Sequence, residues 1–254
     1  MSQDFTHIDY EKIAFRITRF ISENVKIREK KGVIIGLSGG LDSSVCLVLT
    51  AKALSKTRIL GLIMPERGVT PQKDIDNAYE LAEKFKIRYK EIHIDSAKKI
   101  LLRNLPNDKL SGGNLSARLR MALLFHYAGM ENLLVLGTSD KSEIMIGYFT
   151  KYGDGAADIL PIGELYKTQV RFLANKLGLS SNIVNQPSSP RLWKGHVAEK
   201  ELGLTYDEID TILQYSLSGD LDKCALNKAK IKKVTEMVRK SSHKRERIPV
   251  CDPF

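Results

Sequence analysis

The stretch Gly36-Leu37-Ser38-Gly39-Gly40-Leu41-Asp42-Ser43-Ser44 decides how the chain folds. It follows an apolar run, Val33-Ile34-Ile35, that predicts a buried strand, and it leads into the apolar residues 45–54, which predict a buried helix. A strand, a glycine-rich turn and a helix start together form an anion site, because the first helical turn has free N–H groups and the positive end of the helix dipole. Gly39 and Gly40 let the backbone approach a phosphate closely.

The same turn carries a carboxylate, Asp42, where a phosphate would sit, and it lacks the Gly-Lys-Ser/Thr ending of a Walker P-loop. A carboxylate repels phosphate unless a cation lies between them, and Mg²⁺ is the simplest bridging ion. The alternative is that Asp42 is an ordinary N-cap. The pattern Ser-Gly-Gly-x-Asp-Ser after an apolar strand is more specific than a bare Gly-Gly turn, and it resembles the pyrophosphate-binding loop of the ATP pyrophosphatases.

Composition limits the class of protein. The chain has 254 residues, a formal charge of +10 and a sequence pI of about 9.4, which favour a polyanionic ligand such as a nucleotide or nucleic acid. A solvated basic surface explains most of the lysines, so we expect no nucleic-acid partner. The three cysteines form no Cys-x-x-Cys pair, which indicates a reducing compartment. The polar start and the absence of a long apolar run predict a cytoplasmic protein with no membrane segment.

Apolar runs that alternate with helical patterns predict an α/β fold, doubly wound, with a mainly parallel sheet and helices on both faces. The expected strands are 33–37, 59–64, 89–94 and 133–136. The expected helices are 9–27, 45–54, 71–85, 96–103, 115–129, 140–146, 164–177, 206–216 and 222–239, and residues 106–113, 186–195 and 240–254 are expected to be irregular. We expect one domain over residues 1–254, with an N-terminal helix at about 9–27 and a C-terminal helical part at about 206–239. Ligands bind at the carboxyl ends of such strands, so the segments 36–44, 65–70, 137–143 and the one after 94 should converge.

Two further segments carry chemistry. Residues 137–143 leave the fourth strand and open a helix, where Glu143 either completes a capping box with Asp140 or acts as a second Mg²⁺ carboxylate beside Asp42. Residues 147–167 are rich in glycine, aromatic and charged side chains, and they are too long and varied for a simple connection. We interpret 147–167 as a functional loop.

These pieces resemble the ammonia-dependent members of the NAD synthase family, in the family's order and over most of the chain. The matching pieces are Ser38 to Ser44, Asn114 to Met121, Gly137 to Glu143, Gly147 to Lys167, Pro187-Ser188, Leu192 to Gly195, Glu199, Glu201 to Gly203 and His243 to Arg245. The run 147–167 is very specific to this family within the ATP pyrophosphatases. The resemblance implies a Rossmann-like ATP-pyrophosphatase fold.

The resemblance also implies residue roles. The ATP-binding residues would be Gly36, Leu37, Ser38, Gly39, Gly40, Leu41, Asp42, Ser43, Thr138, Lys167 and Ser188. Asp42 and Glu143 would hold Mg²⁺, and Asp42 and Lys167 would be catalytic. The residues in contact with deamido-NAD would be Arg118, Lys151, Asp158, His243 and Lys244. One departure stands out: where the family has Gly-Gln-Thr-x-Glu, this chain has Gly195-His196-Val197-Ala198-Glu199.

The activity implied by the resemblance is a ligase that converts deamido-NAD, ATP and ammonia to NAD, AMP and pyrophosphate through an adenylated intermediate. It also implies a homodimer. Ammonia is the expected nitrogen donor, because no cysteine has the partners that a glutaminase site requires. Two rival hypotheses are a tRNA-modifying ATP pyrophosphatase, which the basic charge would suit, and a non-enzymatic nucleotide sensor of the same fold. The sequence shows no catalytic cysteine pair for the first, and the intact Asp42, Glu143 and Lys167 argue against the second.

Overall fold

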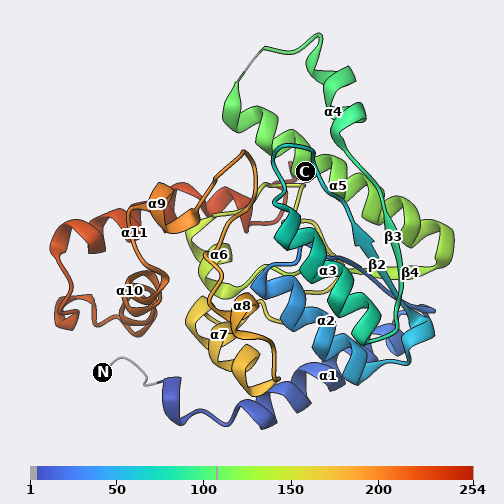
Figure 1. Cartoon of the computed structure of the whole chain (residues 1–254). Helices are drawn as coiled ribbons and strands as arrows, with labels where there is room; N and C mark the ends of the chain where they lie inside the picture. The colour runs from blue at the N-terminus through green and yellow to red at the C-terminus, as the bar shows by residue number, and fades with distance from the viewer. Residues whose placement is uncertain (1–4, 107, 254) are drawn as a thin grey trace.

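Four parallel strands form a central sheet in the order β3-β2-β1-β4, in a computed structural model that describes residues 5–106 and 108–253 (Figure 1). The strands are β1 (Gly32–Gly36), β2 (Ile59–Ile63), β3 (Arg88–Glu91) and β4 (Leu133–Leu136). The central strand is β1, in which Ile34 lies opposite Leu60 on one side and opposite Val135 on the other. The order confirms the predicted parallel sheet, and it brings the turns after β1, β2 and β4 to one edge.

Helices cover both faces of the sheet, and side chains alternate between the faces along each strand. Val33 and Ile35 pack in one core with α1 (Tyr10–Ile27), α2 (Leu41–Ala53), α3 (Gln72–Lys84), α7 (Lys167–Lys176) and α8 (Ser181–Val184). Ile34, Leu60 and Val135 point the other way, toward α5 (Lys109–Glu131), which α4 (Asp95–Leu102) precedes. The predicted doubly wound α/β fold is therefore confirmed.

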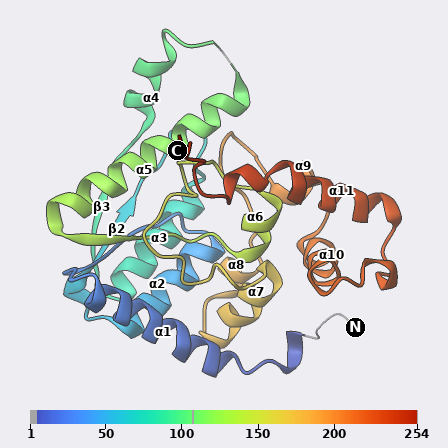
Figure 2. The ribbon, with the colours of Figure 1, turned by 180° about the vertical axis from the view of Figure 1, so that it is seen from behind.

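The last helices form a third, smaller core beside the sheet. It joins α6 (Lys141–Ile146) to α9 (Ala198–Leu202), α10 (Tyr206–Ser218) and α11 (Lys228–Lys240), around Tyr206, Ile209 and Val234. Figure 2 shows α10 and α11 to one side of the sheet, with α6 and α7 between them and the strands. None of the helices in residues 5–106 and 108–253 is both long and apolar enough to span a bilayer.

The structure changes several predicted boundaries. Helix α5 begins at Lys109, inside the predicted loop 106–113, because the Asp108 side chain caps it by accepting a hydrogen bond from Ser111 N at 2.7 Å. Gly113 suggests a helix break, but here it allows close packing, since a Cβ at this position would lie 2.5 Å from Leu192 Cβ. Residue 107 lies outside the described residues, as do residues 1 and 254, the limits of the predicted domain.

Three other elements are shorter than predicted, and two were missed. Helix α7 begins at Lys167 rather than at 164, since Tyr166 is extended. Helix α11 begins at Lys228 rather than at 222, because Asn227 caps it and a 3₁₀ turn (Leu221–Lys223) precedes it. Strand β3 ends at Glu91 rather than at 94. The short helices α8 and α9 lack enough turns to give a clear periodic pattern.

Candidate active site

The turn between β1 and α2 has free backbone donors. Gly40 precedes α2 with no side-chain cap, so the first N–H groups of the helix face outward. Gly39 has a φ of +70°, and a Cβ there would lie 1.8 Å from the Asp74 carbonyl oxygen, so this position requires glycine. The hydroxyl groups of Ser38 and Ser43 lie 2.9 Å apart and close the turn. The turn therefore has the strand, glycine and helix-start geometry that the sequence predicts, and this geometry suits an anion.

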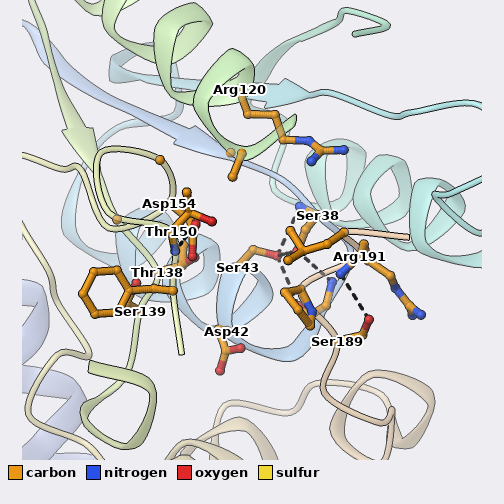
Figure 3. A pocket seen from close by; sticks show the side chains of 18 of the residues that line it. Ser38, Asp42, Ser43, Arg120, Thr138, Ser139, Thr150, Asp154, Ser189 and Arg191 are labelled. Atoms are coloured by element: carbon orange, nitrogen blue, oxygen red, sulfur yellow. Dashed lines mark hydrogen bonds between the residues drawn. The ribbon is translucent and has the colours of Figure 1, made fainter. Parts of the chain in front are cut away.

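A cavity of about 430 Å³ opens beside this turn (Figure 3). Its walls come from the carboxyl ends of β1, β2 and β4, from α5, and from the segments 147–156 and 186–192. The cavity combines apolar walls, such as Leu37 and Met121, with hydroxyl groups and charges, as nucleotide sites do. The predicted ATP-binding residues that line it are Gly36, Leu37, Ser38, Gly40, Leu41, Asp42, Ser43, Thr138 and Ser188. Gly39 and Lys167 lie behind this lining.

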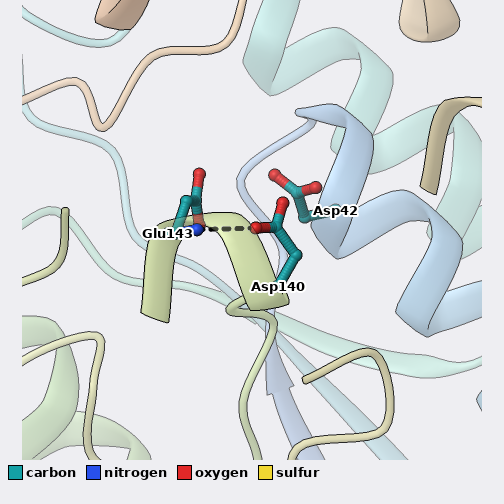
Figure 4. Close-up of side chains that lie close together, drawn as sticks. All are labelled: Asp42, Asp140 and Glu143. Carbon is teal, nitrogen blue, oxygen red and sulfur yellow. Dashed lines mark hydrogen bonds between the residues drawn. The ribbon is translucent and has the colours of Figure 1, made fainter. Parts of the chain in front are cut away.

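Three carboxylates and one ammonium meet at the floor of this site. Lys167 Nζ lies 2.7 Å from Asp42 Oδ2, 2.8 Å from Asp140 Oδ2 and 2.9 Å from Glu143 Oε1, and its side chain is fully buried. Figure 4 shows the three carboxylates, from α2 and α6, turned toward one another. Asp140 also caps α6, since its Oδ1 accepts a hydrogen bond from Glu143 N at 2.9 Å. Asp140 therefore has the predicted capping role, whereas the Glu143 side chain points to Lys167.

The electrostatics of the cluster follow from burial and crowding. Burial raises the pKa of Glu143 to about 8 and that of Asp140 to about 6, and the neighbouring carboxylates add to both shifts, while Lys167 opposes them. Burial lowers the pKa of Lys167, but the three carboxylates outweigh it and hold that pKa well above its usual value. The ammonium is therefore charged, and three carboxyl groups face this one cation in the described cluster.

The residues of the cluster fit a divalent cation. Asp42, Asp140 and Glu143 each offer a carboxylate oxygen, and these oxygens lie within 4.8 Å of one another. Asp42 Oδ1 is buried and has no hydrogen-bond partner among the described residues. Hard oxygen ligands with excess negative charge are what Mg²⁺ prefers. Sequence reasoning missed Asp140 as a member of this set, although its place just after β4, at the same sheet edge as Asp42, was a usable signal.

The residues predicted to contact deamido-NAD lie mostly outside the cavity. Arg118 Nη2 donates to the Lys151 carbonyl at 3.3 Å, and Lys151 Nζ donates to the His243 carbonyl at 2.6 Å, so these three residues are neighbours. Lys244 lines the cavity and holds the segment 147–149, because its Nζ donates to the carbonyl groups of Gly147 and Phe149. The Asp158 carboxylate accepts a hydrogen bond from Val135 N at 2.7 Å.

Arg120 and Arg191 also line the cavity, and sequence reasoning missed both. Arg120 Nε donates to the Met64 carbonyl at 3.0 Å, and burial lowers the pKa of this guanidinium. Arg120 comes two residues after Arg118 on α5, which places it on another face of the helix. Arg191 forms two hydrogen bonds to the buried Asp74, at 2.7 Å and 3.2 Å. Nothing in the local sequence indicates that these two residues, far apart in the chain, would pair.

The segment 186–196 lies beside the cavity, and its residues 186–192 line one side of it. Gln186 Nε2 donates to Asp74 Oδ1 at 2.8 Å, next to the Arg191 contact. His196, in the stretch that departs from the family pattern, is buried with its ring stacked on Trp193 at 3.6 Å between centroids. Its Nε2 lies 2.7 Å from the Glu201 carboxylate. His196 therefore packs within the segment and does not line the cavity.

The family model for NAD synthase matches residues 13–248 of the chain. An NH(3)-dependent NAD(+) synthetase from Hyperthermus butylicus is 48% identical over 254 residues, which cover 97% of this chain and 92% of that protein. A protein with the same name from Staphylothermus marinus is 45% identical, over 98% of this chain and 94% of that protein.

Solved structures agree with these sequence relatives. An NMN synthetase from Francisella tularensis superposes with a TM-score of 0.87 at 33% identity, over 97% of this chain and 100% of that chain. An NH3-dependent NAD synthetase from Campylobacter jejuni, solved with a nitrate ion, has a TM-score of 0.84 at 32% identity, over 96% of this chain and 100% of that chain.

Proposed function

The chain belongs to the NAD synthase family, and we propose that it is a ligase that makes NAD from deamido-NAD, ATP and ammonia, releasing AMP and pyrophosphate. The observation that carries this proposal is the anion-binding turn of α2 placed directly beside the carboxylate cluster, in a chain whose relatives carry that name. Neither rival hypothesis, the tRNA-modifying enzyme or the nucleotide sensor, is favoured by these relatives.

The reaction has two steps. A carboxylate does not accept an amine directly, because the leaving group would be oxide, so the nicotinate carboxylate first attacks the α-phosphorus of ATP and expels pyrophosphate. Ammonia then displaces AMP from the mixed anhydride and forms the amide. The protein contributes mainly by orienting the two substrates and by placing charges where the phosphates become more negative. The free N–H groups at the start of α2 and the hydroxyl groups of Ser38 and Ser43 would donate hydrogen bonds to the phosphates of ATP.

Asp42, Asp140 and Glu143 would hold Mg²⁺, which supplies charge neutralisation at the ATP phosphates when bound. Lys167 keeps the three carboxylates together in the absence of substrate, because its ammonium contacts all of them. We assign catalytic roles to Asp42 and Lys167 on this basis. Thr138 and Ser188 line the cavity and would contact ATP.

We assign the dinucleotide to the side of the cavity where Lys244 lies. Arg118, Lys151 and His243 extend from that side as one connected group, and Asp158 lies beside β4, bonded to Val135. Arg120 adds a buried cation inside the cavity itself. Cationic side chains along this path suit the pyrophosphate of a dinucleotide.

We also propose a cytoplasmic homodimer in which residues 1–254 act as one synthetase domain. Exposed apolar side chains on α4, on α5 and between them support an interface between copies: Ile100, Leu101, Leu105, Leu110, Phe125 and Met130. Light scattering on the purified chain tests this. A monomer mass at high protein concentration would contradict the dimer.

The direct test of the function is product analysis. Purified chain receives ATP, Mg²⁺, ammonium chloride and deamido-NAD, and we expect NAD and AMP in equal amounts. Glutamine free of ammonia replaces ammonium in one arm, and we expect no product there. Because one structural relative is named an NMN synthetase, nicotinate mononucleotide replaces deamido-NAD in another arm, and faster turnover in that arm would reassign the substrate.

A further inference from the structure

Asp210, on α10, lies outside the cavity but is hydrogen-bonded to two of the three helices that carry the charged cluster, α6 and α7. It is 1% exposed. Its Oδ1 accepts a hydrogen bond from the Ser142 hydroxyl of α6, and its Oδ2 accepts two from Thr168 of α7, from the backbone N at 2.9 Å and from Oγ1 at 2.7 Å. A buried carboxylate with all these donors holds its neighbours firmly in place.

The contact with Ser142 continues to Lys167. Lys167 N donates to Ser142 Oγ at 2.9 Å, so the hydroxyl of Ser142 accepts from Lys167 and donates to Asp210. Lys167 and Thr168 are the first two residues of α7, and their N–H groups lack partners within that helix. Asp210 therefore caps α7 from another helix, with a negative charge at the positive end of the helix dipole.

A second residue of α10 reaches the same cluster. Tyr206 lies one helical turn before Asp210, on the same face of α10. Its hydroxyl donates to Glu143 Oε1 at 3.4 Å, and Lys167 Nζ lies 5.2 Å from the centre of its ring. Helix α10 thus packs behind the cluster. Asp210 accepts a hydrogen bond from the backbone of α7, and Tyr206 contacts the side chains of Glu143 and Lys167.

We infer that Asp210 is a positioning residue for the ligase reaction: it fixes the start of α7 so that the Lys167 ammonium stays centred among Asp42, Asp140 and Glu143. Asp210 acts through Ser142 and Thr168 and touches neither substrate nor the reacting atoms. The inference rests on the proposed function. If Asp210 is lost, the N–H group of Thr168 loses its acceptor, and Ser142, which accepts from Lys167 N, loses the carboxylate that orients its hydroxyl. The start of α7 should then shift, and the carboxylates around Lys167 should separate.

The test is the substitution Asp210→Asn in the full chain. We expect kcat to fall by about 10- to 100-fold, as for other groups that orient metal ligands, with little change in the KM for deamido-NAD. Calorimetry should show weaker Mg²⁺–ATP binding, which is a readout independent of turnover. Ser142→Ala should have a smaller effect of the same kind. The double variant should lose less than the sum of the two, because both residues act along one chain of hydrogen bonds.

The matched control is Thr205→Ala on the same helix. Thr205 Oγ1 caps α10 by accepting a hydrogen bond from Glu208 N at 3.2 Å, away from Asp210 and the cluster. The Thr205 side chain is exposed, although the next residue, Tyr206, reaches the cluster. Removal of the Thr205 hydroxyl should lower the Tm by about 2–4 °C while kcat per folded molecule and Mg²⁺–ATP affinity stay unchanged. If Asp210→Asn behaves like this control, with lower stability alone, Asp210 has a purely structural role and the inference is wrong.

A variant that fails to fold and a wild type that makes no NAD can both be distinguished from a failure of the inference. If Asp210→Asn does not fold, Thr168→Val decides, since it removes one hydroxyl hydrogen bond to Asp210 and leaves the backbone bond in place. A lower kcat with weaker Mg²⁺–ATP binding in Thr168→Val supports the inference, and wild-type values overturn it. If the unmodified chain makes no NAD, the proposed function has failed, whereas normal wild-type turnover with an unaffected Asp210→Asn is a failure of this inference alone.

Discussion

Two buried cation–carboxylate clusters lie at the cavity, and their charge balance differs. Asp74 faces one guanidinium, Arg191, and both of its oxygens accept hydrogen bonds, with Gln186 adding another. Lys167 instead faces three carboxylates, and Asp42 Oδ1 has no hydrogen-bond partner among the described residues.

The difference separates a structural pair from a binding site. A balanced, fully hydrogen-bonded pair leaves no capacity for a ligand, so the Asp74–Arg191 pair serves to hold the segment 186–191 against α3. An unbalanced cluster is costly to bury, and it is relieved by a further cation. Substitutions and metal removal should therefore affect the two clusters differently, and the largest effect is expected at the Asp74–Arg191 pair.

The balanced pair should depend on both partners. Arg191→Met leaves Asp74 buried without its cation, and we expect the free energy of unfolding to fall by about 3–5 kcal/mol. Adding Asp74→Asn removes the unpaired charge and keeps an acceptor for Gln186, so the double variant should recover most of the loss. Urea denaturation measures all three proteins. If the single and double variants are equally unstable, the pair is not the balanced unit that we describe.

The unbalanced cluster should instead control turnover. Asp42→Asn removes one ligand carboxylate, and we expect kcat to fall by about 10²–10³-fold, the size of loss seen when one preorganised electrostatic group is removed. Steady-state assays over a range of Mg²⁺ concentrations measure this. Asp74→Asn is the control, with lower stability but an unchanged Mg²⁺ concentration for half-maximal activity. Near-normal activity of Asp42→Asn at low Mg²⁺ would rule out the metal role.

Mg²⁺ should stabilise the folded protein. A ligand at about 100 times its Kd adds about 2.7 kcal/mol to the free energy of unfolding. We expect the Tm to rise with Mg²⁺ in the wild type and in Asp74→Asn, and to rise much less in Glu143→Gln. Thermal scans with and without chelator show this. An equal rise in all three proteins would place the ion elsewhere.

The smallest expected effect is on pH dependence. Without metal, burial raises the pKa of Glu143 to about 8, so the folded protein keeps a proton that the unfolded chain releases. The resulting stability is complete below the unfolded pKa, near pH 4, and is lost as the pH rises to about 8. In chelator, the wild type should therefore lose about 1 kcal/mol or more relative to Glu143→Gln between about pH 5 and pH 8. Mg²⁺ should abolish this difference, and parallel pH profiles in chelator would contradict it.

Local patterns were sufficient to predict the sheet and the anion turn. Apolar runs place β1, β2 and β4, and their alternation with helical patterns predicts a parallel sheet, although not the order of its strands. The start of α5 was misplaced, because Gly112 and Gly113 suggest a loop, whereas the Asp108 cap and close packing against Leu192 favour helix. Local sequence preferences fail to predict a helix boundary where tertiary packing overrides them.

Contacts between residues that are far apart in the sequence could not be predicted. Nothing near Lys167 in the sequence indicates that its ammonium lies among carboxylates behind the cavity lining. The same holds for Arg191 with Asp74 and for Asp210 with Ser142, since each pair depends on how helices pack. The role of Asp140 could partly have been predicted from the sequence, because a helix-capping carboxylate at the edge of a parallel sheet is also well placed to bind a cation.

The parallel topology has a consequence for how the protein is made. Asp42, Asp140 and Glu143 leave the ribosome before Lys167, and the contact between Lys167 and Asp42 spans 125 residues. Burying three carboxylates together without the Lys167 ammonium is costly, so we expect this edge of the sheet to reach its final structure only after α7 has emerged. The bond between Asp210 and Ser142, which spans 68 residues, closes later still. Such long-range contacts slow folding, so we expect the charged site to form only after α10 has been synthesised.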